Sequence, residues 1–190
     1  MRRLDLVIGP NGAGKSTFVA FTLAPLLPGS PFVNADEIAR QRWPDDAERH
    51  SYEAARIAAA TRTALIDAGR SFIAETVFSH PSKLDLIAEA HDRDFTVVLH
   101  VLLIPEDLAV ERVRHRVLAG GHRVAEDKIR ERHRRLWDHA VQAIGSCDSA
   151  TVYDNSRRQG PRIVAQFAGG ESIGSPAWPQ WAPAVLTRKR

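Results

Sequence analysis

The sequence predicts an α/β fold in three layers, in which helices cover both faces of a mainly parallel sheet of five to six strands. Short apolar runs alternate along the 190 residues with segments of helical character. The first apolar run, 4–8, leads directly into a glycine-rich loop, and a segment compatible with a helix follows the loop. Ligands of open α/β sheets bind at the carboxyl ends of the strands, so this loop marks the expected functional edge.

The glycine-rich loop fits the phosphate-loop pattern G-x-x-x-x-G-K-[ST] in full. Its glycines let backbone N–H groups converge on phosphate oxygens, and the helix that follows adds its positive end. Lys15 would reach the β- and γ-phosphates of a nucleotide, and the Ser16 hydroxyl would ligate Mg²⁺. The sequence therefore predicts binding of ATP with Mg²⁺. The expected contacts are Gly9, Asn11, Gly12, Ala13, Gly14, Lys15, Ser16 and Thr17.

Further apolar runs along the chain have the length and composition of strands. The run 95–104 is the longest and is apolar almost throughout, which is typical of a central parallel strand. The last run, 162–167, is expected at an edge of the sheet. We therefore expect strands at 4–8, 32–34, 71–75, 95–104, 150–153 and 162–167.

Proline, glycine and acidic residues delimit the expected helices. Pro25 is expected to close the first helix, and Pro44-Asp45-Asp46 to open the second, because proline and acids suit the positive end of a helix. Gly69 is expected to cap the second helix, and Gly120-Gly121 to break a later one. We therefore expect helices at 16–24, 44–68, 81–91, 105–119 and 124–144.

Length and composition suit one domain, 1–167, followed by a tail, 168–190. The hydrophobic content of 44% and the charged content of 26% are ordinary for a globular protein. Gly, Ser and Pro dominate the tail, which we expect to be extended over the surface. No apolar run approaches the ~20 residues that span a bilayer. The first strand leaves no room for a signal peptide, and the lone Cys147 suits a reducing compartment, so we expect a cytoplasmic protein with no membrane contact.

Positive charge is concentrated in one segment. Between residues 111 and 135, eight Arg and one Lys stand against four acidic residues, a local charge of +5 in a chain whose net charge is +3. A nucleic-acid binder usually spreads basic charge over a wide face, which makes nucleic acid an unfavoured partner. A compact basic segment suits a phosphate clamp. We therefore expect an Arg-rich helical lid at about 106–135.

Two carboxylates follow predicted strands, Asp36 after the second strand and Glu75 at the end of the third. A kinase needs a base near the acceptor hydroxyl, and it needs Mg²⁺ and cationic side chains around the transferring phosphoryl group. No hydrophobic run ending in Asp-Glu and no base-recognition motif of the GTPase kind is present. The sequence therefore favours a small-molecule kinase over an ATP-driven motor or a nucleotide-binding module that grips nucleic acid.

An ordered set of motifs resembles that of the zeta-toxin-like kinases, over roughly residues 4–156. The resemblance implies transfer of a phosphoryl group from ATP to the sugar 3′-hydroxyl of UDP-N-acetylglucosamine or a related UDP-sugar. It also implies a small antitoxin protein that holds the enzyme inactive. The motifs are Gly9–Ser16, Phe32-Val33-Asn34-Ala35-Asp36, Phe72-Ile73-Ala74-Glu75-Thr76, Gly120-Gly121-His122-Arg123-Val124 and Tyr153-Asp154-Asn155-Ser156.

The resemblance also implies roles for single residues. Asp36 matches the catalytic base of the family, and Glu75 with Thr76 matches its substrate-contacting pair. Arg116 falls where the family places one phosphate-contacting arginine. Arg112, one helical turn earlier, faces the same way and is expected to contact the substrate.

The second lid residue is less well defined. Some zeta toxins have an Arg-x-Thr-Pro stretch at the place where this chain has His122-Arg123-Val124-Ala125. Either His122 or Arg123 is expected to act on the phosphoryl group. A neutral histidine would stabilise phosphoryl charge less well than arginine, which bears on both efficiency and substrate.

Alternative roles exist for several of these residues. Asp36 could only cap the helix that follows it, and Glu75 could pair with an arginine or serve through Mg²⁺ alone. Asn155 could contact the adenine or only form a turn. His100, inside the longest apolar run, is expected to be a hydrogen-bonded core histidine rather than a ligand. The acceptor could also be another small hydroxylated metabolite.

Overall fold

The computed structural model describes residues 1–119 and 124–188. Within these residues one seven-stranded sheet has the strand order β2-β3-β1-β4-β5-β6-β7. The first five strands in this order pair in parallel, and β6 and β7 pair antiparallel at one end. The strands are β1 (Arg2–Ile8), β2 (Phe32–Val33), β3 (Phe72–Thr76), β4 (Phe95–Leu103), β5 (Ser149–Asp154), β6 (Arg162–Ala168) and β7 (Glu171–Ser172). The predicted mainly parallel α/β sheet is confirmed.

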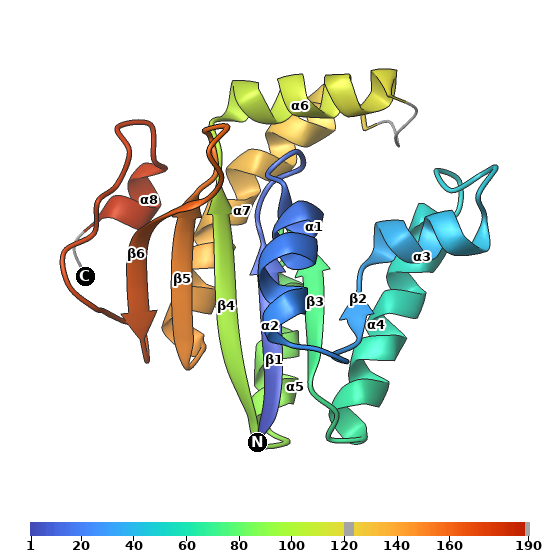
Figure 1. The fold of residues 1–190 in the computed structure, drawn as a ribbon, viewed down its shortest axis with the longest axis horizontal. Coiled ribbons are helices and arrows are strands. Elements are labelled where there is room, and N and C mark those ends of the chain that lie inside the picture. The colour runs from blue at the N-terminus through green and yellow to red at the C-terminus, as the bar shows by residue number, and fades with distance from the viewer. Residues whose placement is uncertain (120–123, 189–190) are drawn as a thin grey trace.

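Helices lie on both faces of this sheet (Figure 1). One short helical segment, α1 (Lys15–Phe18), a π-helical turn (Val19–Leu23) and α2 (Ala24–Leu26), lies in front of β1 in Figure 1. Three helices lie behind the sheet, and α6 crosses the carboxyl ends of the parallel strands. The three helices behind the sheet are α4 (Ser51–Asp67), α5 (Asp85–His91) and α7 (Glu126–Ser146), and a 3₁₀ turn, η2 (Pro81–Lys83), precedes α5. Helix α6 spans Glu106–Leu118.

Among the described residues, buried apolar side chains form two clusters, one for each face of the sheet. Leu4, Leu6 and Ile8 of β1 belong to the cluster under α4, α5 and α7. Val7 of the same strand belongs to the cluster under α1 and α6. This alternation follows the period of two of a strand, and it requires β1 to be apolar on both sides. His100 is buried beside Asp5, with Nε2 2.9 Å from Oδ1, and is therefore the expected core histidine.

The helix predicted at 44–68 is wrong at its start. A separate helix, α3 (Ala35–Arg42), begins directly after β2, and turns at 44–50 separate it from α4. Asn34 initiates α3, because its Oδ1 accepts hydrogen bonds from the backbone N–H of Asp36 and Glu37 at 2.7 and 3.1 Å. The turn that follows is closed by the rings of Trp43 and His50, which stack with centroids 4.4 Å apart.

The first helical segment also extends further than predicted. Pro25 does not close it, because the helical run continues through Pro25 to Leu26, with the π-helical turn Val19–Leu23 directly before α2. The tail contains short elements as well as extended backbone. It contains β7 and the short α8 (Ala184–Thr187), and Trp178 packs against the large core cluster. No helix among residues 1–119 and 124–188 is long and apolar enough to cross a membrane.

Candidate active site

The phosphate loop connects β1 to α1 and lies beneath α6. Gly12 and Gly14 have φ angles of 76° and 81°, in the left-handed region that favours glycine. Space excludes larger residues as well. A Cβ atom at Gly12 would lie 2.7 Å from the Ala109 carbonyl oxygen, and one at Gly14 would lie 2.7 Å from Nδ2 of Asn155. The loop glycines are therefore required by backbone conformation and by packing.

Lys15 lies at the centre of the site and is only 7% exposed. Its Nζ donates a hydrogen bond to the Pro10 carbonyl oxygen at 3.1 Å and lies 3.8 Å from Oε1 of Glu75. Burial lowers the pKa of Lys15, and the nearby Arg116 adds to this, while Glu75 and Asp36 oppose it. Glu75, Asp36 and Arg116, which the sequence predicts as site residues, are therefore all close enough to Lys15 to affect its pKa.

Glu75 joins the phosphate loop to the end of the neighbouring strand. The residue lies beside Val7 in the β1–β3 register, and its side chain is 8% exposed. Its Oε2 accepts hydrogen bonds from Oγ of Ser16 at 2.7 Å and from Nδ2 of Asn34 at 2.6 Å. The Ser16 hydroxyl, in the first turn of α1, and the Glu75 carboxylate, at the end of β3, are hard oxygen donors of the kind that Mg²⁺ prefers. The donor set of Ser16 and Glu75 therefore fits a magnesium ion.

Asp36 lies in the first turn of α3, and its side chain is exposed. The N-cap of α3 is Asn34, so the capping alternative for the Asp36 carboxylate does not hold. In the part of the chain that the structure describes, this carboxylate makes no hydrogen bond or ion pair. It remains available to an acceptor hydroxyl.

Thr76 Oγ1 accepts a long hydrogen bond, 3.4 Å, from the backbone N–H of Phe78.

Asn11 carries an unsatisfied polar group in the phosphate loop. The residue is 7% exposed, and its Oδ1 is buried with no hydrogen-bond partner among the described residues. The oxygen and nitrogen of an amide are assigned from such networks, and the alternative orientation would place two N–H donors at the same point. A buried amide in this loop therefore fits a site that is completed by phosphate oxygens.

Arg112 and Asn155 make contacts within the protein that the sequence did not predict. Arg112 donates to the backbone carbonyl oxygens of Asn155 and Ser156 at 3.0 and 3.4 Å. Asn155 in turn donates from Nδ2 to the Ala13 carbonyl oxygen at 2.7 Å. Contact of Arg112 with an acceptor finds no support in this geometry, because its guanidinium is held at the loop after β5. The side chain of Asn155 supports the phosphate loop itself.

The predicted lid is an ion-paired helix pair. Arg130 of α7 bonds to Glu106 and Asp107 of α6 at 2.9 and 2.8 Å, and also to Glu126 of its own helix. Arg114 of α6 bonds to the same Glu126. Arg114 and Arg130 of the basic segment are thus paired with acidic side chains within the two helices. The predicted second lid residue, His122 or Arg123, lies outside the described residues.

Sequence reasoning missed the role of Asn34, which is 5% exposed and touches both Glu75 and the start of α3. A signal for it existed, because an asparagine two residues before an acidic pair, here Asp36-Glu37, is a typical helix start. For the bonds of Arg112 no such signal existed.

A family model described as an AAA domain matches residues 4–142 of the chain. The chain belongs to the AAA-domain family. A relative from Haemophilus influenzae (strain ATCC 51907 / DSM 11121 / KW20 / Rd), described only as an uncharacterized protein, is 29% identical over 126 residues. That match covers 66% of this AAA-domain chain and 88% of the relative.

Solved structures resemble the AAA-domain chain at low sequence identity, and this likeness concerns the fold. The complex of AvrRxo1-ORF1 and -ORF2 with ATP has a TM-score of 0.68 and 16% identity, and it covers 91% of this chain. The chain spans only 60% of the length of that relative. A structure of the PezAT toxin-antitoxin system of Streptococcus pneumoniae has a TM-score of 0.64 and 12% identity, over 87% of this chain and 72% of the other. The chain has a P-loop kinase-like α/β fold, as the sequence predicted.

Proposed function

We propose that this protein is an ATP- and Mg²⁺-dependent kinase that phosphorylates a hydroxyl group of a small molecule. The observation that carries the proposal is the double role of Asn34. Its Nδ2 donates to Glu75, the carboxylate beside Ser16, and its Oδ1 caps the helix that carries Asp36. One buried side chain therefore ties the metal-binding group to the base, which sets their relative position.

Each residue of the site has a task in this reaction. Lys15 and the loop amides bind the β- and γ-phosphates, and Arg116 stabilises charge on the transferring phosphoryl group from α6. Ser16 and Glu75 hold Mg²⁺, which neutralises charge on the phosphate oxygens when it is bound. Asp36 accepts the proton of the acceptor hydroxyl. The hydroxyl oxygen then forms a bond to the γ-phosphorus, the bond to the bridging β,γ-oxygen breaks, and ADP leaves with that electron pair.

The acceptor lies, in this proposal, between Asp36 and the pair Glu75 and Thr76. A UDP-sugar such as UDP-N-acetylglucosamine is our candidate, and the motif resemblance to the zeta-toxin-like kinases supports it. AvrRxo1-ORF1 is bound to a second protein, and PezAT is a toxin-antitoxin system, which supports an antitoxin partner for a cytoplasmic enzyme. Nucleic-acid binding is disfavoured, because Arg114 and Arg130 of the basic segment are paired with acids.

The test measures ADP release from ATP with Mg²⁺ by the full chain, with and without each member of a panel of UDP-sugars and other hydroxylated metabolites. Stimulation by a UDP-sugar, with the phosphorylated product identified by mass spectrometry, supports both the kinase and the acceptor. Stimulation by a different metabolite retains the kinase and overturns the acceptor. ATP binding without stimulation by any member overturns the proposal for the acceptors tested, and calorimetric titration with ATP provides the binding control.

A further inference from the structure

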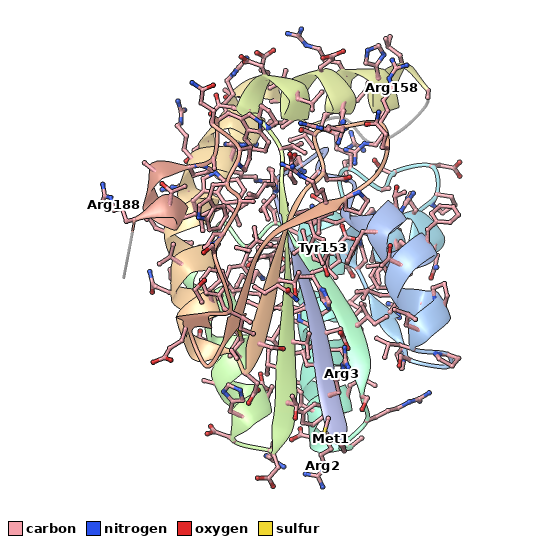
Figure 2. The ribbon with its side chains drawn as sticks, turned by 60° about the vertical axis from the view of Figure 1, so that its left-hand side comes forward. Met1, Arg2, Arg3, Tyr153, Arg158 and Arg188 are labelled. Carbon is pink, nitrogen blue, oxygen red and sulfur yellow. The ribbon has the colours of Figure 1, made fainter. Side chains whose placement is uncertain are left out.

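Helix α6 is fastened to the loop after β5 by one side chain. Nη1 of Arg112 donates to the carbonyl oxygen of Asn155 at 3.0 Å, and Nη2 donates to that of Ser156 at 3.4 Å. The loop is shaped to receive this fork, because the backbone N–H of Ser156 bonds to Oδ1 of Asp154 at 2.9 Å. In Figure 2, Arg158 of this loop lies at the end of the molecule where α6 crosses, opposite Met1 and Arg3.

The same loop is fastened to the phosphate loop. Nδ2 of Asn155 donates to the Ala13 carbonyl oxygen at 2.7 Å, and its backbone N–H donates to Leu103 at the end of β4 at 2.9 Å. Nδ2 also occupies the space that a Cβ atom at Gly14 would need. A chain of hydrogen bonds therefore runs from Arg112 through Asn155 to Ala13. We call these three residues and their bonds the α6 latch.

The α6 latch fixes the helix one turn before Arg116. Arg112 and Arg116 are four residues apart and therefore lie on the same face of α6. Arg116 is close enough to Lys15 for its charge to lower the pKa of that lysine. A rotation of α6 would change the distance between Arg116 and Lys15. Two bonds from a rigid guanidinium restrain such rotation, whereas the single ammonium of a lysine would not span both carbonyl oxygens in the same way.

We propose that Arg112 is a positioning residue of the kinase reaction, which acts by holding Arg116 over the transferring phosphoryl group. The inference rests on the proposed function, because it assigns Arg116 to that group. Arg112 itself touches neither ATP nor acceptor in this proposal. The fold of α6 does not depend on the α6 latch alone, since Ala109, Val110 and Val113 bury the helix against the phosphate-loop side of the core. Loss of Arg112 is therefore expected to shift α6 and not to unfold it.

A double-mutant cycle tests the coupling. We would compare the native protein with Arg112→Ala, Arg116→Ala and the double variant, and measure turnover of ATP with an acceptor of the panel. Removal of Arg116 is expected to lower turnover by about 10²-fold, the usual size for one preorganised donor. Arg112→Ala is expected to lower turnover by roughly tenfold. The double variant is expected to match Arg116→Ala alone, because Arg112 acts only through Arg116 and has no further effect once the Arg116 side chain is removed. Effects of the two changes that multiply would overturn the proposal.

A second readout keeps the α6 latch separable from the kinase proposal. Calorimetry gives the ratio of the affinities for ATP and ADP. This ratio reports how much the γ-phosphate contributes to binding, and its measurement needs no acceptor. This ratio is expected to fall by about tenfold in Arg116→Ala, by several-fold in Arg112→Ala, and no further in the double variant. If no acceptor is turned over but this pattern appears, the positioning role of Arg112 is supported and the kinase assignment fails. An ATP/ADP affinity ratio that is unchanged in Arg112→Ala overturns the proposal that Arg112 positions Arg116.

The matched control is Arg114→Ala. Arg114 lies on the same helix between the two residues and pairs with Glu126 of α7, so its loss also removes an arginine and an ion pair from α6. In the part of the chain that the structure describes, no hydrogen bond joins Arg114 to the loop after β5. The ATP/ADP ratio is therefore expected to stay within twofold of the native value. Arg112→Lys should recover only part of the ratio, because it keeps the charge and loses the fork. An equal fall of the ratio in all three arginine variants would mean that only the charge of the helix matters, and would overturn the proposal.

Discussion

The two ends of the site are built in opposite ways. At the phosphate end, Lys15, Ser16, Asn34 and Glu75 meet side chain to side chain, and the charges there are largely buried. At the other end, Arg112 and Asn155 bind backbone carbonyl oxygens, and those bonds need no ligand. The phosphate end is completed by nucleotide and metal, whereas the α6 latch is complete in the protein alone. We therefore expect changes at the phosphate end to impair chemistry more than stability, and changes at the α6 latch to affect position and affinity.

The largest expected effect lies at the phosphate end. Asp36→Asn should lower turnover of ATP with acceptor by roughly 10²–10⁴-fold, because it removes the base and keeps the shape of the side chain. Affinity for ATP, measured by calorimetry, should stay nearly unchanged, since the Asp36 carboxylate makes no contact with the phosphate loop among the described residues.

Glu37→Gln is the matched control for this change. Glu37 is the next acid in the first turn of α3. Among the described residues its carboxylate pairs with Arg40 at 3.9 Å, and its backbone N–H donates to the Asn34 cap. Its loss should leave turnover within about twofold. If both variants lost turnover equally, the charge at the start of α3 would matter and not a base at position 36.

The same contrast explains what the sequence could predict. Lys15 and Ser16 belong to a motif whose residues are adjacent in the chain, and Glu75 follows a recognisable strand, so residue type and spacing located them. The α6 latch joins positions 43 and 142 residues apart in sequence. Its acceptors are backbone carbonyl oxygens, which every residue has, so no pattern of residue types could reveal it.

The helix starts show the same limit on a smaller scale. Pro44-Asp45-Asp46 has the composition of a helix start, yet residues 44–50 form turns, and α4 begins only at Ser51. The sequence predicts one helix over 44–68, whereas the chain forms α3 before these turns and α4 after them. The start of α3 is set by the hydrogen bonds that Asn34 accepts from the backbone N–H groups of Asp36 and Glu37.

An intermediate effect is expected at Asn34, where the two roles of one side chain can be separated. Asn34→Ser keeps a good helix cap but is too short to reach Glu75, whereas Asn34→Ala loses both contacts. Turnover should fall in both variants by at least roughly tenfold, because a hydrogen bond to a buried carboxylate is lost. Thermal unfolding should show the alanine variant about 1 kcal/mol less stable than the serine variant. A loss of turnover in the alanine variant alone would reduce Asn34 to a cap.

The smallest effect is expected at the α6 latch itself. Asn155→Ala removes the bond to Ala13 but leaves the backbone carbonyl oxygen that receives Arg112, so α6 stays fastened to the loop while the loop is loosened from the phosphate loop. One neutral hydrogen bond contributes about 1 kcal/mol, which corresponds to roughly fivefold in affinity. Calorimetry should therefore show ATP and ADP weakened alike, with their ratio unchanged, because Arg116 keeps its place. A fall in the ATP/ADP ratio instead would mean that Arg116 depends on Asn155 as much as on Arg112, and the α6 latch would then act as one unit.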